Sequence, residues 1–216
     1  MKRPPLFDPE TYLALHSTPE PEILTRISRH THLTQVYPQM LSGHLQGTFL
    51  RFLCMLLKPQ EILEIGTFTG YSAVAMALGA PQARVHTIEA NPELEEIILH
   101  HIHLAGLEER ITLHMGDAPE IIPTLDQSWD LVFIDADKPN YLNYYRMVAG
   151  KMNPGGIILA DNVLWDGKVL NDPEVMDRDT RAIHEFNQFV QQDPRVENLI
   201  IPLRDGLMVI LGIGNE

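Results

Sequence analysis

Short apolar runs alternate with longer helical stretches through the middle of the chain, and this alternation limits the possible folds severely. Five runs have the length and composition of buried strands: residues 62–65, 84–88, 111–114, 131–134 and 156–160. Helical patterns occupy residues 71–78, 92–105 and 141–152, the last followed by Asn153-Pro154-Gly155-Gly156. Strands joined by helices build parallel sheets through βαβ crossovers. We therefore predict an α/β fold with helices on both faces of a mostly parallel sheet.

The last part of the chain breaks this alternation. Residues 199–203 and 207–213 are both apolar, and only Arg204-Asp205-Gly206 separates them. Three residues are too few for a crossover helix, so the two segments are predicted to form an antiparallel hairpin. A parallel sheet closed by one antiparallel pair is typical of Rossmann-like methyltransferases, whereas NAD dehydrogenases usually continue with parallel units or a second domain.

The first part, to about residue 57, is predicted to be helical. Thr18 followed by Pro19 and acidic residues indicates a helix start, and a second helix is expected over residues 42–57. With 216 residues and no visible linker, the sequence predicts one domain over residues 1–216.

Composition argues against several partners. The chain has 16 basic and 29 acidic residues, a net charge of −13, which would repel a phosphate backbone. No apolar run reaches the length of a membrane span, and acidic residues rather than an apolar signal core follow the first residues. The single cysteine, Cys54, lies in an apolar stretch and is interpreted as a core residue. We expect a cytoplasmic protein that binds neither nucleic acid nor membrane.

A nucleoside site is predicted at the first three strand ends. Gly66 and Gly70 follow the first strand in a Gly-x-x-x-Gly turn, which lacks the Gly-x-Gly-x-x-Gly fingerprint of NAD binding. Glu89 ends the second strand, where a carboxylate binds a ribose diol. Gly116-Asp117-Ala118 ends the third strand and could flank an adenine. Taken singly, the turn could merely connect a strand to a helix and Glu89 could be a solvated loop acid.

A hard cation is predicted at the next two strand ends. Asp135 ends the fourth strand, and Asp161 and Asn162 end the fifth. Ligands gather beyond the carboxyl ends of such strands, and three oxygen donors suit Mg²⁺ better than zinc. Lys138 lies in the loop after Asp135, where a lysine beside a cation could accept a proton. Alone, Asp161-Asn162 could be a turn or helix cap, and Lys138 a surface residue.

Several segments closely resemble the cation-dependent O-methyltransferases, the group of caffeoyl-CoA and catechol O-methyltransferases. They are residues 64–72, 135–144 and 155–165, together with Asp193-Pro194-Arg195 and Asp205-Gly206-Leu207. The resemblance covers nearly the whole chain, and residues 12–40 look like the helical N-terminal section of the caffeoyl-CoA branch. An Asp-Ala-Asp-Lys run followed by Asp-Asn is rare outside this family.

This resemblance implies a Rossmann-like methyltransferase fold of seven strands in the order 3-2-1-4-5-7-6, usually in a homodimer. It implies transfer of a methyl group from S-adenosylmethionine to a hydroxyl of a small, catechol-like aromatic acceptor, with Mg²⁺, or alternatively Mn²⁺ or Ca²⁺. The carried-over cofactor contacts are Ser42, Glu64, Gly66, Thr67, Ser72, Glu89, Ala118 and Asp135. The carried-over metal ligands are Asp135, Asp161 and Asn162, and the base is Lys138.

Two departures favour the caffeoyl-CoA-like branch over catechol specificity. Asp137 stands where animal catechol enzymes have tryptophan, and Leu199 aligns with an acid that orients the catechol. An NAD-dependent reductase is disfavoured because no Tyr-x-x-x-Lys pair follows the fourth strand. A non-catalytic S-adenosylmethionine-binding protein would not need the metal triad and Lys138.

The histidines of the sequence suggest no second metal site. His100 and His103 could share one face of a helix with no evident third ligand. His30, His32 and His44 are interpreted as surface or interface residues.

Overall fold

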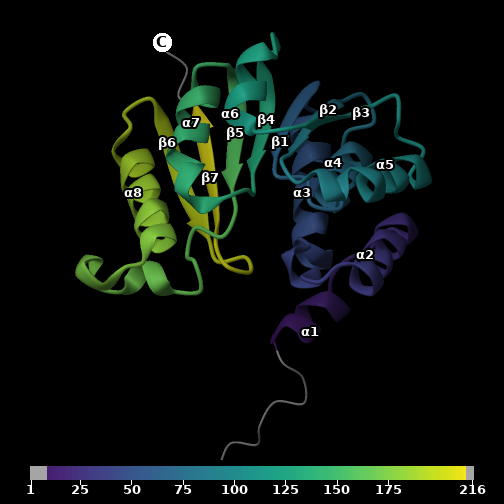
Figure 1. Ribbon diagram of the computed structural model, residues 1–216, viewed down its shortest axis with the longest axis horizontal. Helices are drawn as coiled ribbons and strands as arrows, with labels where there is room; N and C mark the ends of the chain where they lie inside the picture. Colours follow the sequence, from purple (N-terminus) through teal and green to yellow (C-terminus); the bar gives the residue numbers. More distant parts are fainter. Residues whose placement is uncertain (1–8, 213–216) are drawn as a thin grey trace, which may run out of the picture.

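A seven-stranded sheet forms the centre of the computed structural model, which describes residues 9–212 (Figure 1). Its order is β3-β2-β1-β4-β5-β7-β6, as the family resemblance predicted. The parallel strands are β1 (Glu61–Ile65), β2 (Arg84–Glu89), β3 (Ile111–Met115), β4 (Trp129–Ile134) and β5 (Met152–Ala160). The pair β6 (Val196–Ile201) and β7 (Leu207–Gly212) forms the predicted hairpin, and β7 runs antiparallel to β5.

Helices cover both faces of this sheet (Figure 1). Alternate strand residues point to opposite faces, so Ile62 joins the core beneath one helical layer and Leu63 the core beneath the other. One layer contains α2 (Glu22–Thr34), α3 (Gly43–Leu57), α4 (Tyr71–Gly79) and α5 (Glu95–Leu104), and α1 (Pro9–Leu15) contacts α3. The other contains α6 (Ala118–Ile121), α7 (Tyr141–Ala149) and α8 (Arg178–Gln192).

The predicted start of the first long helix was wrong. Helix α2 begins at Glu22, and Pro21 occupies its N-cap position. Proline disfavours helical geometry at the residue before it, so Glu20 does not begin a helix that continues through Pro21. Instead of capping this helix, Thr18 accepts a hydrogen bond at its carbonyl oxygen from His44 Nε2, at 2.7 Å.

Two strand boundaries also differ from the sequence prediction. Helix α7 ends at Ala149, and the presumed turn after it belongs to β5, which begins at Met152. Gly155 has a φ of +78°, and the pairing with β4 is irregular between Met152 and Ile157. Strand β6 begins three residues before the predicted start at 199, with exposed Glu197 and Leu199 alternating along an edge strand. Ile213, predicted to end the last strand, and residues 1–8 and 214–216 of the predicted domain lie outside the described residues.

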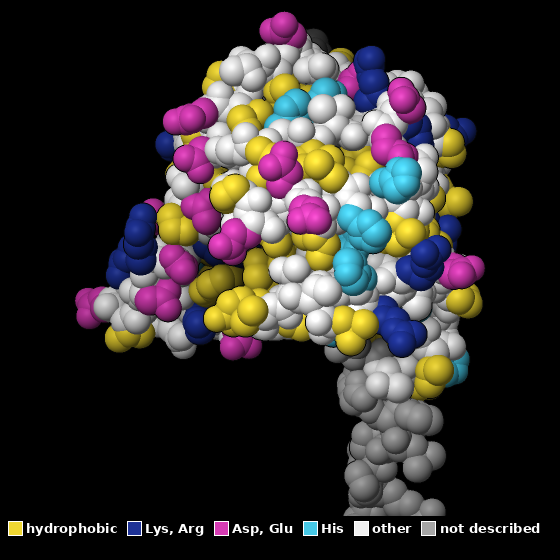
Figure 2. Space-filling model, turned by 45° about the vertical axis from the view of Figure 1, so that its right-hand side comes forward, with side chains coloured by type: hydrophobic (Ala, Val, Ile, Leu, Met, Phe, Trp, Pro, Cys, Tyr) yellow, Lys and Arg dark blue, Asp and Glu magenta, His cyan; other side chains and the backbone are white. Residues whose placement is uncertain are grey.

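Membrane insertion finds no support in the described helices, since none of them combines the length and apolarity of a bilayer span. On the face shown in Figure 2, acidic side chains are spread widely and basic side chains stand in separate places.

Helix α3 packs closely against α4. A Cβ atom built on Gly79 of α4 would lie 2.3 Å from the Arg51 carbonyl oxygen of α3 and 2.8 Å from Cys54 Cβ. The helices could not approach this closely with any side chain at that position.

We expect Gly79→Ala to lower the free energy of unfolding by about 1 to 3 kcal/mol, because the new methyl group overpacks a backbone contact. Gly150→Ala is the matched control, since a Cβ atom there meets nothing within 4 Å. Urea denaturation of both variants measures the difference. Equal stability of the two variants would contradict the rigid packing of α3 on α4.

Candidate active site

A cleft of about 1330 Å³ lies at the carboxyl ends of the parallel strands. Nearly all of the predicted site residues line it, although they come from distant parts of the sequence. They are Ser42, Gly66, Thr67, Ser72, Glu89, Ala118, Asp135, Lys138, Asp161 and Asn162. Glu64 is the exception, because its side chain is completely buried beneath the cleft.

The glycine turn after β1 places the backbone against the neighbouring strand. Gly66 has a φ of +96°, and a Cβ atom there would lie 2.0 Å from the Asp135 carbonyl oxygen. The amide of Gly66 donates to the Ile88 carbonyl oxygen at 3.0 Å, and the amide of Asp135 donates to the Ile65 carbonyl oxygen at 2.9 Å. The ends of β1, β2 and β4 are therefore held together, and a larger residue at Gly66 would separate them.

Glu89 is fixed at the tip of β2 by two backbone amides. The Phe68 amide donates to Oε2 at 2.8 Å, and the Asn91 amide donates to Oε1 at 2.9 Å. Each carboxylate oxygen still has a free lone pair, so the group can accept further hydrogen bonds from a ligand in the cleft. Such an arrangement suits a ribose diol.

Glu64 is linked to the cleft lining indirectly, through hydrogen bonds. Thr87 donates to Glu64 Oε2 and shares a hydrogen bond with Thr67, which lines the cleft. Burial raises the pKa of Glu64 to about 8, against the opposing effect of hydrogen bonds from Ser72 and Thr87. A neutral, protonated Glu64 is therefore favoured in the folded protein at neutral pH.

Two carboxylates and an amide meet where β4 and β5 end, as predicted. Asp161 is buried. Its carboxylate accepts hydrogen bonds from Gln46 Nε2 at 2.7 Å and from the backbone N–H of Asn162 at 2.8 Å. Burial, and then repulsion from Asp135, raises the pKa of Asp161 to about 6. Asn162 has a φ of +56°, a conformation that asparagine tolerates better than most residues. A bound cation would stabilise the ionised carboxylates.

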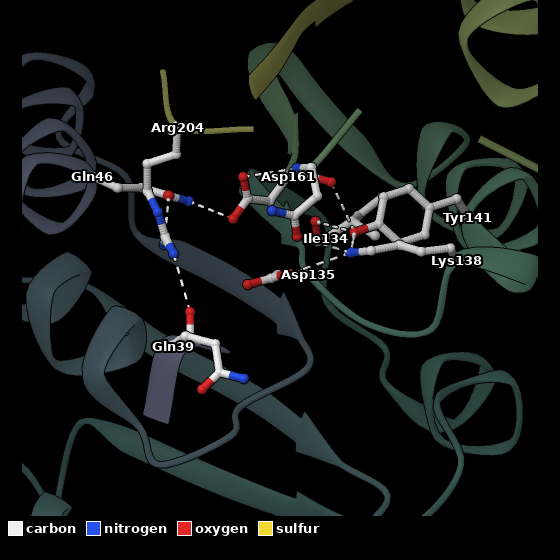
Figure 3. A network of polar contacts seen from close by, with 9 residues as sticks. Gln39, Gln46, Ile134, Asp135, Lys138, Tyr141, Asp161 and Arg204 are labelled. Carbon is white, nitrogen blue, oxygen red and sulfur yellow. Dashed lines mark hydrogen bonds and ion pairs between the residues drawn. The ribbon is translucent and has the colours of Figure 1, made fainter. Parts of the chain in front are cut away.

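Lys138 is buried beside these oxygens, with only 7 % of its surface exposed. Its Nζ donates to Asn162 Oδ1 at 3.1 Å and to the Tyr141 hydroxyl at 2.5 Å, and it lies 3.5 Å from Asp135 Oδ1 (Figure 3). The alternative of a surface lysine is therefore wrong. The ammonium group shows that these oxygens accommodate positive charge.

Sequence reasoning missed three residues of this network: Gln46, Tyr141 and Arg204. The Tyr141 hydroxyl donates to the Asp161 carbonyl oxygen at 3.0 Å and accepts from Lys138. Burial, with the charges of Asp135 and Asp161, raises the pKa of Tyr141 well above its usual value, so it keeps its proton. One signal was available for Gln46, which shares a helical stripe with the buried residues Leu50 and Cys54.

The histidines have more partners than the sequence suggested. His30 Nδ1 lies 2.8 Å from His101 Nε2, and His101 Nδ1 donates to the Thr69 carbonyl oxygen at 2.8 Å. His44 contacts the Thr18 carbonyl oxygen, as described above. Figure 2 shows histidine side chains in separate places on this face, near the top and on the right-hand side. Within residues 9–212, however, no three His, Cys, Asp or Glu side chains are grouped to hold a metal ion.

Comparison with known proteins places this geometry in context. A family model described as O-methyltransferase matches residues 14–213. Caffeoyl-CoA O-methyltransferase 2 of Populus trichocarpa is 34% identical over 205 residues, covering 87% of this chain and 81% of the relative. The caffeoyl-CoA O-methyltransferase of Medicago sativa is 34% identical over 179 residues, covering 76% and 71%.

Solved structures of the same kind superpose over nearly the whole chain. The SAH-bound methyltransferase PaMTH1 of Podospora anserina has a TM-score of 0.88 and 27% identity, covering 99% of this chain and 100% of that protein. The O-methyltransferase TomG of Streptomyces achromogenes, in complex with SAM, has a TM-score of 0.86 and 29% identity, covering 94% and 95%.

The raised pKa of Glu64 predicts a pH-dependent stability. Between its ordinary value of 4.5 and about 8, the folded chain keeps a proton that the unfolded chain releases. The free energy of unfolding therefore falls as pH rises through this window, by about 1.4 kcal/mol per unit at most from this group. Glu64→Gln should flatten the profile, measured by denaturation between pH 5 and 8. Glu197→Gln, on the exposed side of β6, should not; a Glu64→Gln profile parallel to the wild type would contradict the prediction.

Proposed function

Because this chain belongs to the O-methyltransferase family, we propose that it transfers a methyl group from S-adenosylmethionine to a small aromatic acceptor with two adjacent hydroxyls. We further propose that a divalent cation is required. The observation that carries the proposal is the grouping of Asp135, Asp161 and Lys138 at the wall of a cleft that also contains Glu89 and the glycine turn. The caffeoyl-CoA relatives support an aromatic acceptor.

The cofactor is assigned to the part of the cleft between the ends of β1, β2 and β3. S-Adenosylmethionine would supply an electrophilic methyl group on a sulfonium centre. Glu89 would accept hydrogen bonds from the ribose, Gly66 gives room for close approach to the backbone, and Ala118 would lie against the adenine. Ser42, Thr67, Ser72 and Asp135 complete the proposed contacts. Glu64 would act indirectly, by fixing Thr67 through Thr87.

The cation is assigned to Asp135, Asp161 and Asn162. Their oxygens are the donors that hard cations prefer, with Mg²⁺ first and Mn²⁺ or Ca²⁺ as alternatives. Such a cation would supply Lewis acidity that favours the ionised form of an acceptor hydroxyl. The chain contributes the orientation: Gln46 and the Asn162 amide hold the Asp161 carboxylate, and Tyr141 holds the Asp161 backbone.

Lys138, in its neutral amine form, is proposed to take the proton from the acceptor hydroxyl onto the lone pair of Nζ and so become the ammonium. The Tyr141 hydroxyl and Asn162 Oδ1 fix this nitrogen in place, and the rings of Tyr141 and Trp165 lie 4.5 and 5.6 Å from it. Trp165 also lines the cleft, where its ring offers an apolar surface for an aromatic acceptor. An alternative role for Lys138 is to orient the acceptor without exchanging a proton.

We propose that the chain forms a homodimer whose interface is the outer face of α3. Phe52, Met55 and Leu56 are 43, 51 and 82% exposed there, and a second copy of the chain would shield them from water. Sedimentation equilibrium should return twice the chain mass, and a monomer at micromolar concentration would contradict this assembly.

The metal requirement predicts that Asp161→Ala abolishes turnover while changing the affinity for S-adenosylmethionine little, because Asp161 binds the cation and not the cofactor. Turnover of a catechol or hydroxycinnamoyl thioester, with calorimetric titration of the cofactor, measures both. Asp126→Ala, an exposed site, is the control. Full activity of the wild type in excess chelator would refute the metal proposal. Binding of NADH in place of S-adenosylmethionine would refute the assignment of the cofactor.

If Lys138 is the base, Lys138→Ala should lower turnover by about 100-fold or more while metal and cofactor binding are preserved. Lys138→Arg separates the two roles, since arginine keeps the positive charge and hydrogen bonds but does not accept a proton at neutral pH. A base role predicts that both variants are slow. Recovery of turnover in Lys138→Arg, or a change confined to the Michaelis constant, would show that Lys138 only orients the acceptor.

A further inference from the structure

Gln46 is a fully buried amide in an otherwise apolar stripe of α3. Burial of an amide is unfavourable unless both of its ends are hydrogen-bonded. Both ends are: Nε2 donates to Asp161 Oδ2 at 2.7 Å, and Oε1 accepts from Arg204 Nη1 at 3.2 Å (Figure 3). Gln46 therefore joins a guanidinium group to the carboxylate to which we assign the cation.

The chemistry of its neighbours fixes the orientation of this amide. A guanidinium group only donates hydrogen bonds, so the Gln46 oxygen must face Arg204. A carboxylate only accepts them, so the nitrogen must face Asp161. If the Gln46 amide were rotated by 180°, its nitrogen would face the donors of Arg204 and its oxygen would face the Asp161 carboxylate. Arg204 thus ensures that a donor points at Asp161 Oδ2.

Arg204 is itself held in the turn between β6 and β7. Its φ of +49° is a conformation that few residues other than glycine adopt readily, and its guanidinium group makes two further hydrogen bonds. Nη1 donates to the Ser42 carbonyl oxygen at 2.6 Å, and Nη2 donates to the Gln39 carbonyl oxygen at 3.2 Å. Gln39 and Ser42 both line the cleft, so Arg204 holds a wall of the cleft as well as Gln46.

We propose that Gln46 and Arg204 are a positioning pair that holds the Asp161 carboxylate in place for the divalent cation. This inference rests on the proposed metal site. Hydrogen bonds to Oδ1 from the Asn162 amide and to Oδ2 from Gln46 restrict rotation of the carboxylate. Residues that orient metal ligands in this way commonly change metal affinity by about 10- to 100-fold when they are replaced.

The two members of the pair have different expected effects. Gln46→Met preserves the length of the side chain but removes the donor, so it should weaken cation binding alone. Arg204→Met also releases the Ser42 and Gln39 carbonyl oxygens, so it should weaken both cation and S-adenosylmethionine binding. Because Arg204 acts on Asp161 through Gln46, the double variant should bind the cation no more weakly than Gln46→Met does.

The experiment titrates Mn²⁺ into the full chain without acceptor, following free Mn²⁺ by electron paramagnetic resonance, and titrates S-adenosylmethionine separately without metal. Gln46→Met should raise the Kd for Mn²⁺ by about 10-fold or more. Gln82→Met is the matched control, because the Gln82 amide donates to the Pro59 carbonyl oxygen, which precedes the start of β1 and so lies at the opposite end of that strand from the cleft. Its Kd for Mn²⁺ should equal that of the wild type.

A folded Gln46→Met protein with a wild-type Kd for Mn²⁺ would overturn the inference while leaving the metal proposal intact. Failure of the wild type to bind Mn²⁺ would overturn both. If Gln46→Met does not fold, Gln46→Asn retains a buried amide but is one methylene shorter, and the same rise in Kd is expected. A wild-type Kd in that variant would equally overturn the pair.

Discussion

The electrostatic repulsion between Asp135 and Asp161 is the constraint on which the arrangement of the cleft depends. Both carboxylates end neighbouring parallel strands, so the fold places them together, and burial of Asp161 strengthens their repulsion. Their neighbours all donate: Lys138 to the Asp135 side, Gln46 and the Asn162 amide to Asp161. These donors offset the burial of Asp161 and its repulsion from Asp135 only in part, since the pKa of Asp161 remains raised. The proposed cation would complement this remaining negative charge.

Helix α3 both packs against the core and contributes a polar side chain to the cleft site. Its close contact with α4 at Gly79 sets its position against the sheet, and that position allows Gln46 to reach Asp161. The helical N-terminal section therefore does more than cover the core on one face. It supplies Gln46 to a site whose two carboxylates follow β4 and β5.

The sequence predicted the strand ends well because the physics there is local. A buried run followed by Asp135, or by Asp161-Asn162, is enough to place those residues at one edge of a parallel sheet. Gln46, Tyr141 and Arg204 were missed because their roles depend on contacts that the local pattern does not encode. The start of β5 was missed for the opposite reason: Asn-Pro-Gly-Gly is a strong local turn signal, and pairing with β4 overrides it. Glu64 was expected to contact the cofactor directly, yet its side chain is fully buried and does not line the cleft, and this burial, which raises its pKa, appears only in the structure.

The hydrogen bonds of Arg204 have a consequence for the order of events during folding. They join residues separated by 158, 162 and 165 positions, and the Gln46–Asp161 hydrogen bond spans 115. Contacts between residues this distant in sequence require the closure of long loops, which is entropically unfavourable. They therefore form late, after local helices and neighbouring strands. During synthesis, a growing chain can assemble much of the sheet before residue 204 leaves the ribosome. Until then Gln46 lacks the guanidinium group that fixes the orientation of its amide, so the hydrogen bonds around Asp161 are completed only after the turn between β6 and β7 has formed.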